Sequence, residues 1–138
     1  LEELAYNTEN VYSVKCKVHK CYDSALTRDI ASDLEKGGRE SVHLFRIAQE
    51  ALGNAVKHGQ AANVDILLQK TGEHIELTVK DDGCGFETEK RHRGVGLESM
   101  RHRASLINGI LCVHSTVGRG TTVRCSIPVL ESGCDGEI

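Results

Sequence analysis

The chain has 138 residues, 39% of them hydrophobic and 4% aromatic, and its formal net charge at pH 7 is -3. This length suits one domain with a single core filled mainly by Leu, Ile and Val. The slightly acidic balance excludes a general basic surface for nucleic acid. No apolar run approaches the roughly 18 residues of a membrane-spanning helix, and no signal-peptide pattern is visible. We therefore expect a cytoplasmic domain, whether or not the full-length protein has a membrane anchor.

Six cysteines are scattered along the chain without a CxxC pair: Cys16, Cys21, Cys84, Cys112, Cys125 and Cys134. The even number permits disulfides, and Cys16 with Cys21 could bind a metal if other ligands joined them. The lack of paired spacing favours reduced thiols in a reducing compartment. Cys112 and Cys125 fall in apolar, strand-like segments, where we expect cysteine to act as a small hydrophobic residue.

The N-terminal part of the chain predicts three elements. Residues 1–9 resemble the end of a linker helix, so we expect the chain to be cut from a longer protein. Residues 10–18 alternate well enough to predict a strand. Residues 23–36 predict a short helix or a structured loop, which the glycines at 37–38 would end.

Residues 39–58 have strong helical periodicity, and Gly59 follows as the expected stop. A projection at about 100° per residue predicts one apolar stripe, made of Phe45, Ala48, Leu52, Ala55 and Val56. The opposite face contains Glu50, Asn54, Lys57 and His58, with Arg46 beside them. Glu50 and Asn54 are i,i+4 neighbours whose side chains converge. Two oxygen ligands followed by a cation would suit a Mg²⁺–phosphate group, although an ordinary solvated helix face looks the same.

Two hairpins are predicted in the rest of the chain. Segments 63–69 and 74–80 form the first, and segments 110–116 and 121–129 form the second. Residues 86–94 are polar and charged, which predicts a loop between the hairpins.

A second helix is expected at 95–108, with Gly109 as its C-cap. Its apolar side would consist of Leu97, Met100, Ala104 and Ile107. The domain should then cover residues 10–130 and leave a frayed tail at 131–138. Together the elements predict an α+β fold, a two-layer sandwich in which helices cover one face of a mixed, mostly antiparallel sheet.

Asp81 ends a predicted strand in which Ile75, Leu77 and Val79 share one face. Alternation therefore directs Asp81 toward the helix layer, at the edge of the core. A carboxylate in that position is costly unless it meets a hydrogen-bond donor, and the amino group of a purine would supply one. Asp82 has the opposite parity and is expected to be a turn residue.

Thr121 alternates in the same way with Val123, Cys125 and Ile127. This parity puts its hydroxyl in the same layer as Asp81. Since threonine is also simply a good strand residue, the observation alone does not require a ligand.

Four glycines surround these positions. Gly83 and Gly85 would let the backbone approach a ligand with no Cβ in the way. Gly94 and Gly96 open the second helix, whose N–H groups and dipole would attract an anion. This is not the dinucleotide fingerprint, because the third glycine and the preceding strand are missing. Each signal is weak alone, and their order and spacing together are more specific.

In that order and spacing the chain resembles the GHKL ATPases, which have the Bergerat nucleotide-binding fold. The segment EALGNAVKH looks like the N box, DDGCGF the G1 box, GVGL the G2 box and GRGTT the closing Gly-Thr motif. The resemblance covers roughly Arg39 to Val129. FRIAQEALGNAVKHG and GVGLESMRHRA are similar to the ATP-binding domains of bacterial sensor histidine kinases, in particular the subfamily that partners LuxR-type response regulators.

The resemblance implies ATP and Mg²⁺ as ligands. Asn54 would bind the Mg²⁺ that bridges the ATP phosphates. Glu50 stands where the ATP-hydrolysing relatives have their general base, and in a kinase it would either polarise the attacking group or orient the metal. Lys57 and His58 would lie near the phosphates, and Glu50, Asn54 and Lys57 would be the catalytic set.

The resemblance also assigns the remaining site residues. Asp81 would accept a hydrogen bond from the adenine amino group, so guanine should be rejected. Gly83 and Gly85 would line the adenine pocket, and Thr121 would support Asp81 through water. The backbone of Gly94, Val95, Gly96 and Leu97 would face the phosphates.

By the same resemblance the activity would be that of a protein-histidine kinase, with the acceptor histidine on a dimerisation domain outside this chain. None of the seven histidines has the expected setting beside an acidic residue on a dimerisation helix. The partners would be that domain and a cognate response regulator, without nucleic acid or direct membrane contact, and the isolated piece would be a monomer. Two alternatives stay open: a serine kinase of the anti-sigma type, and a nucleotide-gated interaction module that has lost catalysis.

Overall fold

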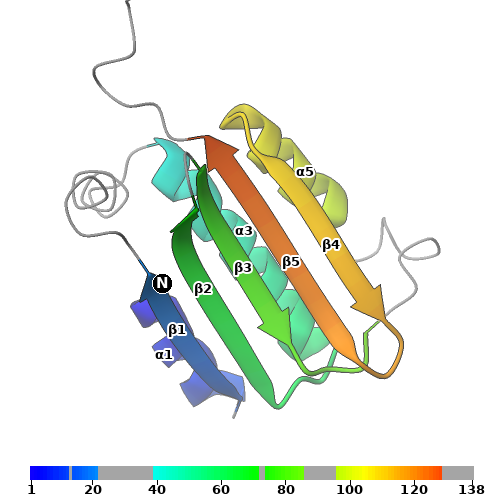
Figure 1. Cartoon of the computed structure of the whole chain (residues 1–138). Helices are drawn as coiled ribbons and strands as arrows, with labels where there is room; N and C mark the ends of the chain where they lie inside the picture. The colour runs from blue at the N-terminus through cyan, green and yellow to red at the C-terminus, as the bar shows by residue number, and fades with distance from the viewer. Residues whose placement is uncertain (13, 22–38, 72–73, 86–95, 129–138) are drawn as a thin grey trace, which may run out of the picture.

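The structure, a computed structural model, describes residues 1–12, 14–21, 39–71, 74–85 and 96–128. The described strands form one sheet in the spatial order β1-β2-β3-β5-β4 (Figure 1). Their bounds are Lys15–Cys21 (β1), Asn63–Thr71 (β2), His74–Asp81 (β3), Ile110–Thr116 (β4) and Gly120–Pro128 (β5). β1 pairs with β2 in parallel, and every other neighbouring pair is antiparallel. Both predicted hairpins are confirmed.

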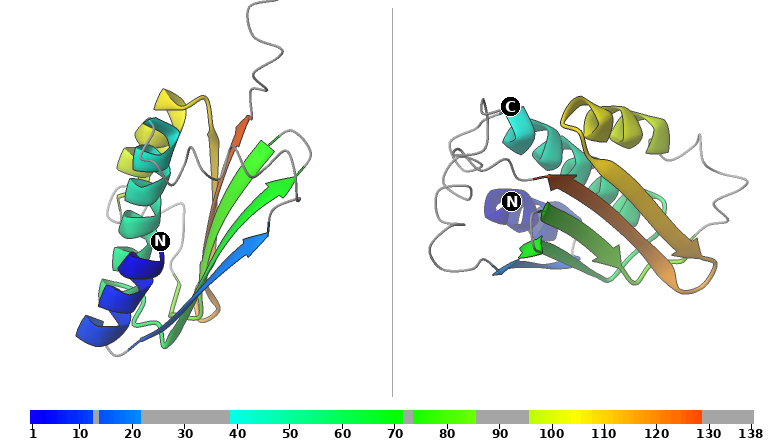
Figure 2. Two further views of the ribbon diagram at one scale, coloured as in Figure 1. Left: turned by 90° about the vertical axis from the view of Figure 1, so that its left-hand side faces the viewer. Right: turned by 45° about the horizontal axis from the view of Figure 1, so that its top comes forward.

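Three helices are described: α1 (Glu2–Tyr12), α3 (Arg39–Lys57) and α5 (Leu97–Leu106). All three lie against the same face of the sheet, and no described helix covers the other face (Figure 2). The predicted α+β two-layer architecture is therefore confirmed. None of the described helices is both long enough and apolar enough to cross a membrane.

The core lies between the helix layer and the sheet. α3 contributes its buried side chains from a continuous arc, namely Leu44, Ile47, Ala48, Ala51, Leu52 and Ala55. The projected stripe was wrong at Phe45, which is 37% exposed. α3 contacts α1, α5 and three strands, and these neighbours centre the buried arc on Ile47 and Ala51, so that Phe45 falls at its edge.

The second predicted helix is shorter than expected and ends differently. Its buried residues are the four expected ones, Leu97, Met100, Ala104 and Ile107. The expectation that Gly109 is the C-cap was wrong, because the C-cap is Ile107 and the residue with a positive φ, 58°, is Asn108. The Gly109 N–H donates to the Ala104 carbonyl at 2.8 Å and the Asn108 N–H to that of Ser105 at 3.3 Å. This is a Schellman ending with asparagine in the left-handed position.

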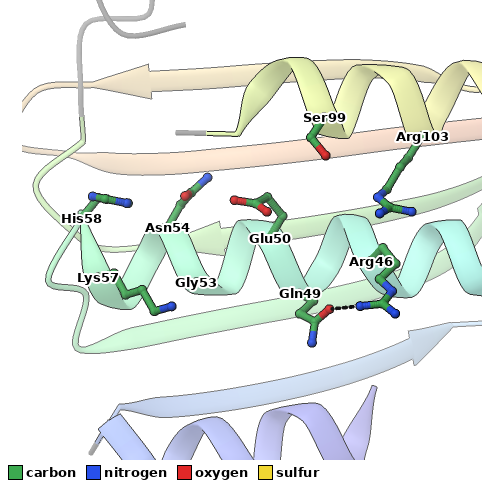
Figure 3. A pocket seen from close by; sticks show the side chains of 9 residues that line it. All are labelled: Arg46, Gln49, Glu50, Gly53, Asn54, Lys57, His58, Ser99 and Arg103. Carbon is green, nitrogen blue, oxygen red and sulfur yellow. Dashed lines mark hydrogen bonds between the residues drawn. The ribbon is translucent and has the colours of Figure 1, made fainter. Parts of the chain in front are cut away.

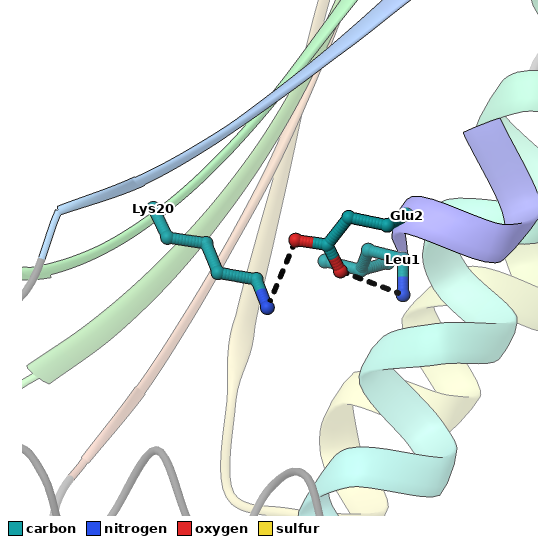
Figure 4. A network of polar contacts seen from close by, with 3 residues as sticks. All are labelled: Leu1, Glu2 and Lys20. Atoms are coloured by element: carbon teal, nitrogen blue, oxygen red, sulfur yellow. Dashed lines mark ion pairs between the residues drawn. The ribbon is translucent and has the colours of Figure 1, made fainter. Parts of the chain in front are cut away.

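The N-terminal strand begins later than predicted. Residues 10–12 belong to α1, and β1 starts only at Lys15. α1 is held to the strand at both ends, because the Cys16 N–H donates to Glu9 Oε2 at 2.9 Å and Lys20 Nζ pairs with Glu2 Oε2 at 3.0 Å (Figure 4). The hydrogen bond with Lys20 lowers the pKa of the Glu2 carboxyl. The expectations for residues 23–36, 86–94 and 131–138 fall outside the described residues.

The four cysteines whose side chains are described are free thiols. Cys125 is fully buried, as expected, but Cys112 is exposed. On the edge strand β4 the residues facing the helices are the neighbours of Cys112, Leu111 and Val113, which pack against the core. Cys112 therefore points to the uncovered face of the sheet, where the apolar character of the segment does not bury it.

Candidate functional site

The polar face of α3 lines a cavity of about 410 Å³ between α3 and α5 (Figure 3). Its lining residues from α3 are Arg46, Gln49, Glu50, Gly53, Asn54 and Lys57, with His58 just beyond the helix and Ser99 and Arg103 from α5. A volume of this order is typical of small-molecule sites. The helical projection thus placed Glu50, Asn54, Lys57 and His58 on the correct face. The sequence analysis assigned no role to Arg46, and it did not single out Gln49 on the same helix or Ser99 and Arg103 on α5.

Ser99 and Arg103 carry a signal that could have been found. They are i,i+4 neighbours on α5 and lie one position before the core residues Met100 and Ala104. They therefore occupy the flank of the helix next to its buried face. Only the packing of α5 against α3 shows that this flank closes a cavity.

Glu50 and Gly96 meet where the two helices converge. Gly96 is the N-cap of α5 and has a φ of 73°. A Cβ at Gly96 would overlap the Glu50 carboxylate. The Glu50 carboxylate therefore lies at the first turn of α5. Of the second glycine motif, the structure describes Gly96 and Leu97. Gly94 and Val95, the other two residues of that motif, lie outside the described residues.

Asp81 is buried at the end of β3, as its strand parity predicts, with 8% of its surface exposed. It lies opposite Val64 on one neighbouring strand and opposite Thr121 on the other. The Gly83 N–H donates to Asp81 Oδ1 at 2.8 Å. Burial raises the pKa of the Asp81 carboxyl, and hydrogen bonds from the backbone of Gly83 and Thr121 partly oppose this rise. A buried carboxylate of this kind is suited to a specific donor from a ligand.

Thr121 shares the layer of Asp81 but has its own partner. The Thr121 and Ser115 hydroxyl oxygens are 2.8 Å apart, and Ser115 Oγ also donates to the Gly120 carbonyl at 3.3 Å. The cross-strand pairing of Asp81 with Thr121 confirms the shared layer. A water-mediated contact between the two side chains stays a prediction.

Asp82, by contrast, is the turn residue that its parity predicts. Its carboxylate accepts hydrogen bonds from the N–H groups of Ala62 and Asn63, both at 2.9 Å, and from Asn63 Nδ2 at 2.8 Å. The bond from the Asn63 side chain is the main cause of a lowered pKa at Asp82. Two adjacent aspartates therefore have opposite environments, one buried next to the site and one fastening the strand end in solvent.

The glycines of the first motif are required by packing within the protein. A Cβ on Gly83 would come within 2.5 Å of the Gly59 carbonyl oxygen, and one on Gly85, at φ 67°, would overlap the Thr116 carbonyl. Between them, the Cys84 N–H donates to the Gly59 carbonyl at 2.8 Å and the Cys84 carbonyl accepts from Gly118 at 2.6 Å. The segment is thus clamped between the end of α3 and the β4–β5 turn. It joins the end of β3, where Asp81 lies, to the C-terminal end of α3.

The comparisons with known proteins agree with this geometry. Residues 39–131 match the family described as histidine kinase-, DNA gyrase B- and HSP90-like ATPases. The chain belongs to this family. ATP is the ligand that the family description implies, and the resemblance noted from the motifs is confirmed.

Curated relatives of this ATPase-family domain include bacterial sensor kinases. It is 32% identical over 134 residues to the signal transduction histidine-protein kinase/phosphatase DegS of Bacillus subtilis, covering 94% of this chain and 33% of DegS. It is 40% identical over 88 residues to the sensor histidine kinase LiaS of the same organism, covering 63% of this chain and 24% of LiaS. The chain thus spans a third or less of these relatives.

Solved structures share the fold of the ATPase domain. The histidine kinase domain of the Erythrobacter litoralis EL346 blue-light activated histidine kinase superposes with a TM-score of 0.64 at 21% identity, over 93% of this chain and 58% of that one. The ATP binding domain of PrrB from Mycobacterium tuberculosis gives a TM-score of 0.58 at 23% identity, over 65% of this chain and 69% of that one.

Proposed function

We propose that this domain binds MgATP and transfers the γ-phosphoryl group to a histidine on a dimerisation domain of a two-component sensor kinase. The observation that carries the proposal is the cavity in which Glu50, Asn54 and Lys57 lie together, with the buried Asp81 at the end of the neighbouring strand. The names of the relatives DegS and LiaS support the histidine as acceptor. By analogy with them, a LuxR-type response regulator would receive the phosphoryl group next.

The lining residues fit a magnesium ion shared with a nucleotide. Glu50 and Asn54 offer a carboxylate and an amide oxygen to the same cavity. No cluster of three or more His, Cys, Asp or Glu residues that could hold a metal is found among the residues described. Mg²⁺ usually takes one or two protein oxygens and completes its shell with phosphates and water. Bound there, the ion would neutralise charge on the phosphate oxygens.

Adenine recognition is assigned to Asp81. Its ionised carboxylate would accept a hydrogen bond from the adenine amino group, whereas guanine has an oxygen at the same place. A site built around one donor rejects a ligand that lacks it, because the buried acceptor is left unpaired. Lys57 and His58 then lie next to the phosphates, and Thr121 supports the carboxylate from the adjacent strand.

In the transfer step the acceptor imidazole nitrogen forms a bond to the γ-phosphorus. The bond from that phosphorus to the β–γ bridging oxygen breaks, and ADP leaves with the electron pair. The attacking nitrogen is the unprotonated one of the imidazole, so the proton on the other ring nitrogen passes to a base. Glu50 is the carboxylate that lines the described cavity. Lys57 stabilises the charge on the phosphates, so that positioning and electrostatics supply most of the catalysis.

The proposal is tested first by calorimetry of ATP and GTP, with and without Mg²⁺. We expect ATP to bind and GTP not to bind, and Asp81→Asn to lose ATP affinity. Asp82→Asn is the matched control, since Asp82 fastens a turn and should leave nucleotide selectivity unchanged. Absence of ATP binding by the unchanged chain would contradict the proposal.

The acceptor is tested with a histidine-bearing dimerisation domain from a sensor kinase, supplied in trans with radiolabelled ATP. Label that appears on that domain and is lost in acid identifies phosphohistidine. Acid-stable label on a serine protein would favour the anti-sigma type of kinase instead. ATP binding without any transfer would leave a nucleotide-gated interaction module.

A further inference from the structure

Two arginines from facing helices reach the same end of the cavity. Arg46 comes from α3 and Arg103 from α5, and Figure 3 shows both side chains beyond Glu50, at the end away from His58. Arg46 Nη1 donates to the neutral Gln49 Oε1 at 3.2 Å. Within the part of the chain that the structure describes, neither guanidinium forms an ion pair with a carboxylate.

The placement of Arg46 and Arg103 at one end of the cavity favours binding of an anion there. Two like charges at one end of a cavity repel each other, unless a shared negative group lies between them. The guanidinium fork matches the oxygens of a phosphate in a bidentate way, which a lysine cannot reproduce. Together with Lys57, and with Glu50 as the one carboxylate of the lining, the arginines make the described cavity wall net positive.

The position of the pair along α3 identifies which phosphate it would meet. Asp81 is joined to the C-terminal end of α3, because Gly83 packs on the Gly59 carbonyl, so the base belongs at that end. At a rise of 1.5 Å per residue, Glu50 lies about 6 Å from Asn54 along the helix axis and Arg46 about 6 Å beyond Glu50. The arginines are therefore at the end farthest from the base, where the terminal phosphate would lie.

We propose that Arg46 and Arg103 together bind the γ-phosphate and make the site prefer ATP to ADP. The inference rests on the proposed nucleotide function and adds a selectivity to it. Arg46 is exposed and Arg103 is half-buried, so replacing them should leave the fold intact.

The test is calorimetry of MgATP and MgADP on the double variant Arg46→Gln/Arg103→Gln. We expect ATP affinity to fall by about tenfold or more, the size expected for a lost charged hydrogen bond. ADP affinity should stay within about twofold, because no γ-phosphate is present. Arg46→Lys/Arg103→Lys should restore only part of the loss, since lysine keeps the charge and loses the fork.

The matched control is Arg39→Gln/Arg101→Gln, which removes one exposed arginine from each of the same two helices outside the cavity lining. It should leave the ratio of ATP to ADP affinity unchanged. An unchanged ratio in Arg46→Gln/Arg103→Gln would overturn the inference. If Arg46→Gln/Arg103→Gln kept the ratio of ATP to ADP affinity but transferred phosphoryl more slowly at saturating ATP, the arginines would contact the acceptor domain instead. If neither nucleotide bound the unchanged chain, the proposed function itself would fail.

Discussion

The carboxylate of Glu50 lies in the space that a side chain on Gly96 would need. Glu50 is in the middle of α3, and Gly96 is the N-cap of α5 with a φ of 73°. A candidate catalytic carboxylate therefore lies at the first turn of the neighbouring helix. Glycine is needed there for the left-handed backbone, whereas a Cβ would meet only the Glu50 side chain, which can move.

Replacing Gly96 with alanine should harm both stability and the site. A left-handed non-glycine residue costs roughly 1–2 kcal/mol, and the new Cβ would displace the Glu50 carboxylate. We expect a lower free energy of unfolding in urea and weaker ATP binding by calorimetry. Adding Glu50→Ala should recover little of the stability, because the left-handed backbone of residue 96 carries most of the cost. Full stability in Gly96→Ala alone would contradict that left-handed conformation.

Gly53→Ala is the matched control for that experiment. Gly53 is in the interior of α3, and a Cβ there would meet nothing within 4 Å. Alanine is favoured over glycine in a helix interior by about 1 kcal/mol. We therefore expect Gly53→Ala to raise the free energy of unfolding, opposite in sign to Gly96→Ala.

Because Asp81 is buried, we expect folding stability and ATP affinity to depend on pH with opposite signs. Burial raises its pKa in the folded protein above the ordinary 3.8, so the folded state binds the proton more tightly than the unfolded state. Its contribution to stability is therefore fully present below 3.8 and is lost as pH rises through the raised pKa. ATP binding needs the ionised carboxylate, so ATP affinity should instead fall as pH decreases through the same window.

The measurement is urea unfolding of the unchanged chain and Asp81→Asn at several pH values on the acid side of neutrality. As pH falls, the unchanged chain should gain unfolding free energy relative to Asp81→Asn, while the ATP affinity of the unchanged chain decreases. Taking the difference cancels the titration of groups that both proteins share, Asp82 among them. A difference that stays constant with pH would show that Asp81 titrates like an ordinary exposed aspartate.

Thiol reactivity should divide the described cysteines into two pairs. Burial raises the pKa of both Cys16 and Cys125 to about 11, and the thiolate is the reactive form. At mildly alkaline pH we expect an alkylating reagent to label the exposed Cys84 and Cys112 first. Mass spectrometry of peptides would measure this, and labelling of Cys16 and Cys125 should appear only in denaturant.

ATP should protect Cys84 and leave Cys112 unaffected. Cys84 lies between Gly83 and Gly85, with its Sγ 3.5 Å from the His58 carbonyl oxygen. Cys112 is on β4 opposite Arg124, on the face that no described helix covers. Equal protection of both thiols would point to a general change in conformation and not to a ligand at the site.

The phase of burial on α3 can be checked by two alanine substitutions. Ile47 is fully buried, and Ile47→Ala should cost about 2–5 kcal/mol of unfolding free energy through lost burial and the cavity left behind. Phe45 is 37% exposed. Phe45→Ala should therefore lower the unfolding free energy by about 1 kcal/mol or less. Chemical denaturation measures both, and a larger loss at Phe45 would favour the stripe projected from the sequence.

Local periodicity was enough to predict much of this protein. Strand alternation put Asp81 and Thr121 on the core side, because side chains on a strand alternate strictly between its two faces. Helical periodicity put Glu50 and Asn54 on one polar face for the same kind of reason. Both predictions depend only on geometry within a single element, and the order of the motifs along the chain was sufficient to indicate the family.

The tertiary structure decided what depends on neighbouring elements. Residues 10–12 continue α1, which contacts β1, although their pattern also suits a strand. The helices beside α3 buried Ile47 and left Phe45 at the edge. The contact of Glu50 with Gly96, and the convergence of Arg46 and Arg103, join positions about 50 residues apart in the sequence. No local pattern encodes such distances, because they depend on how α3 and α5 pack on the sheet.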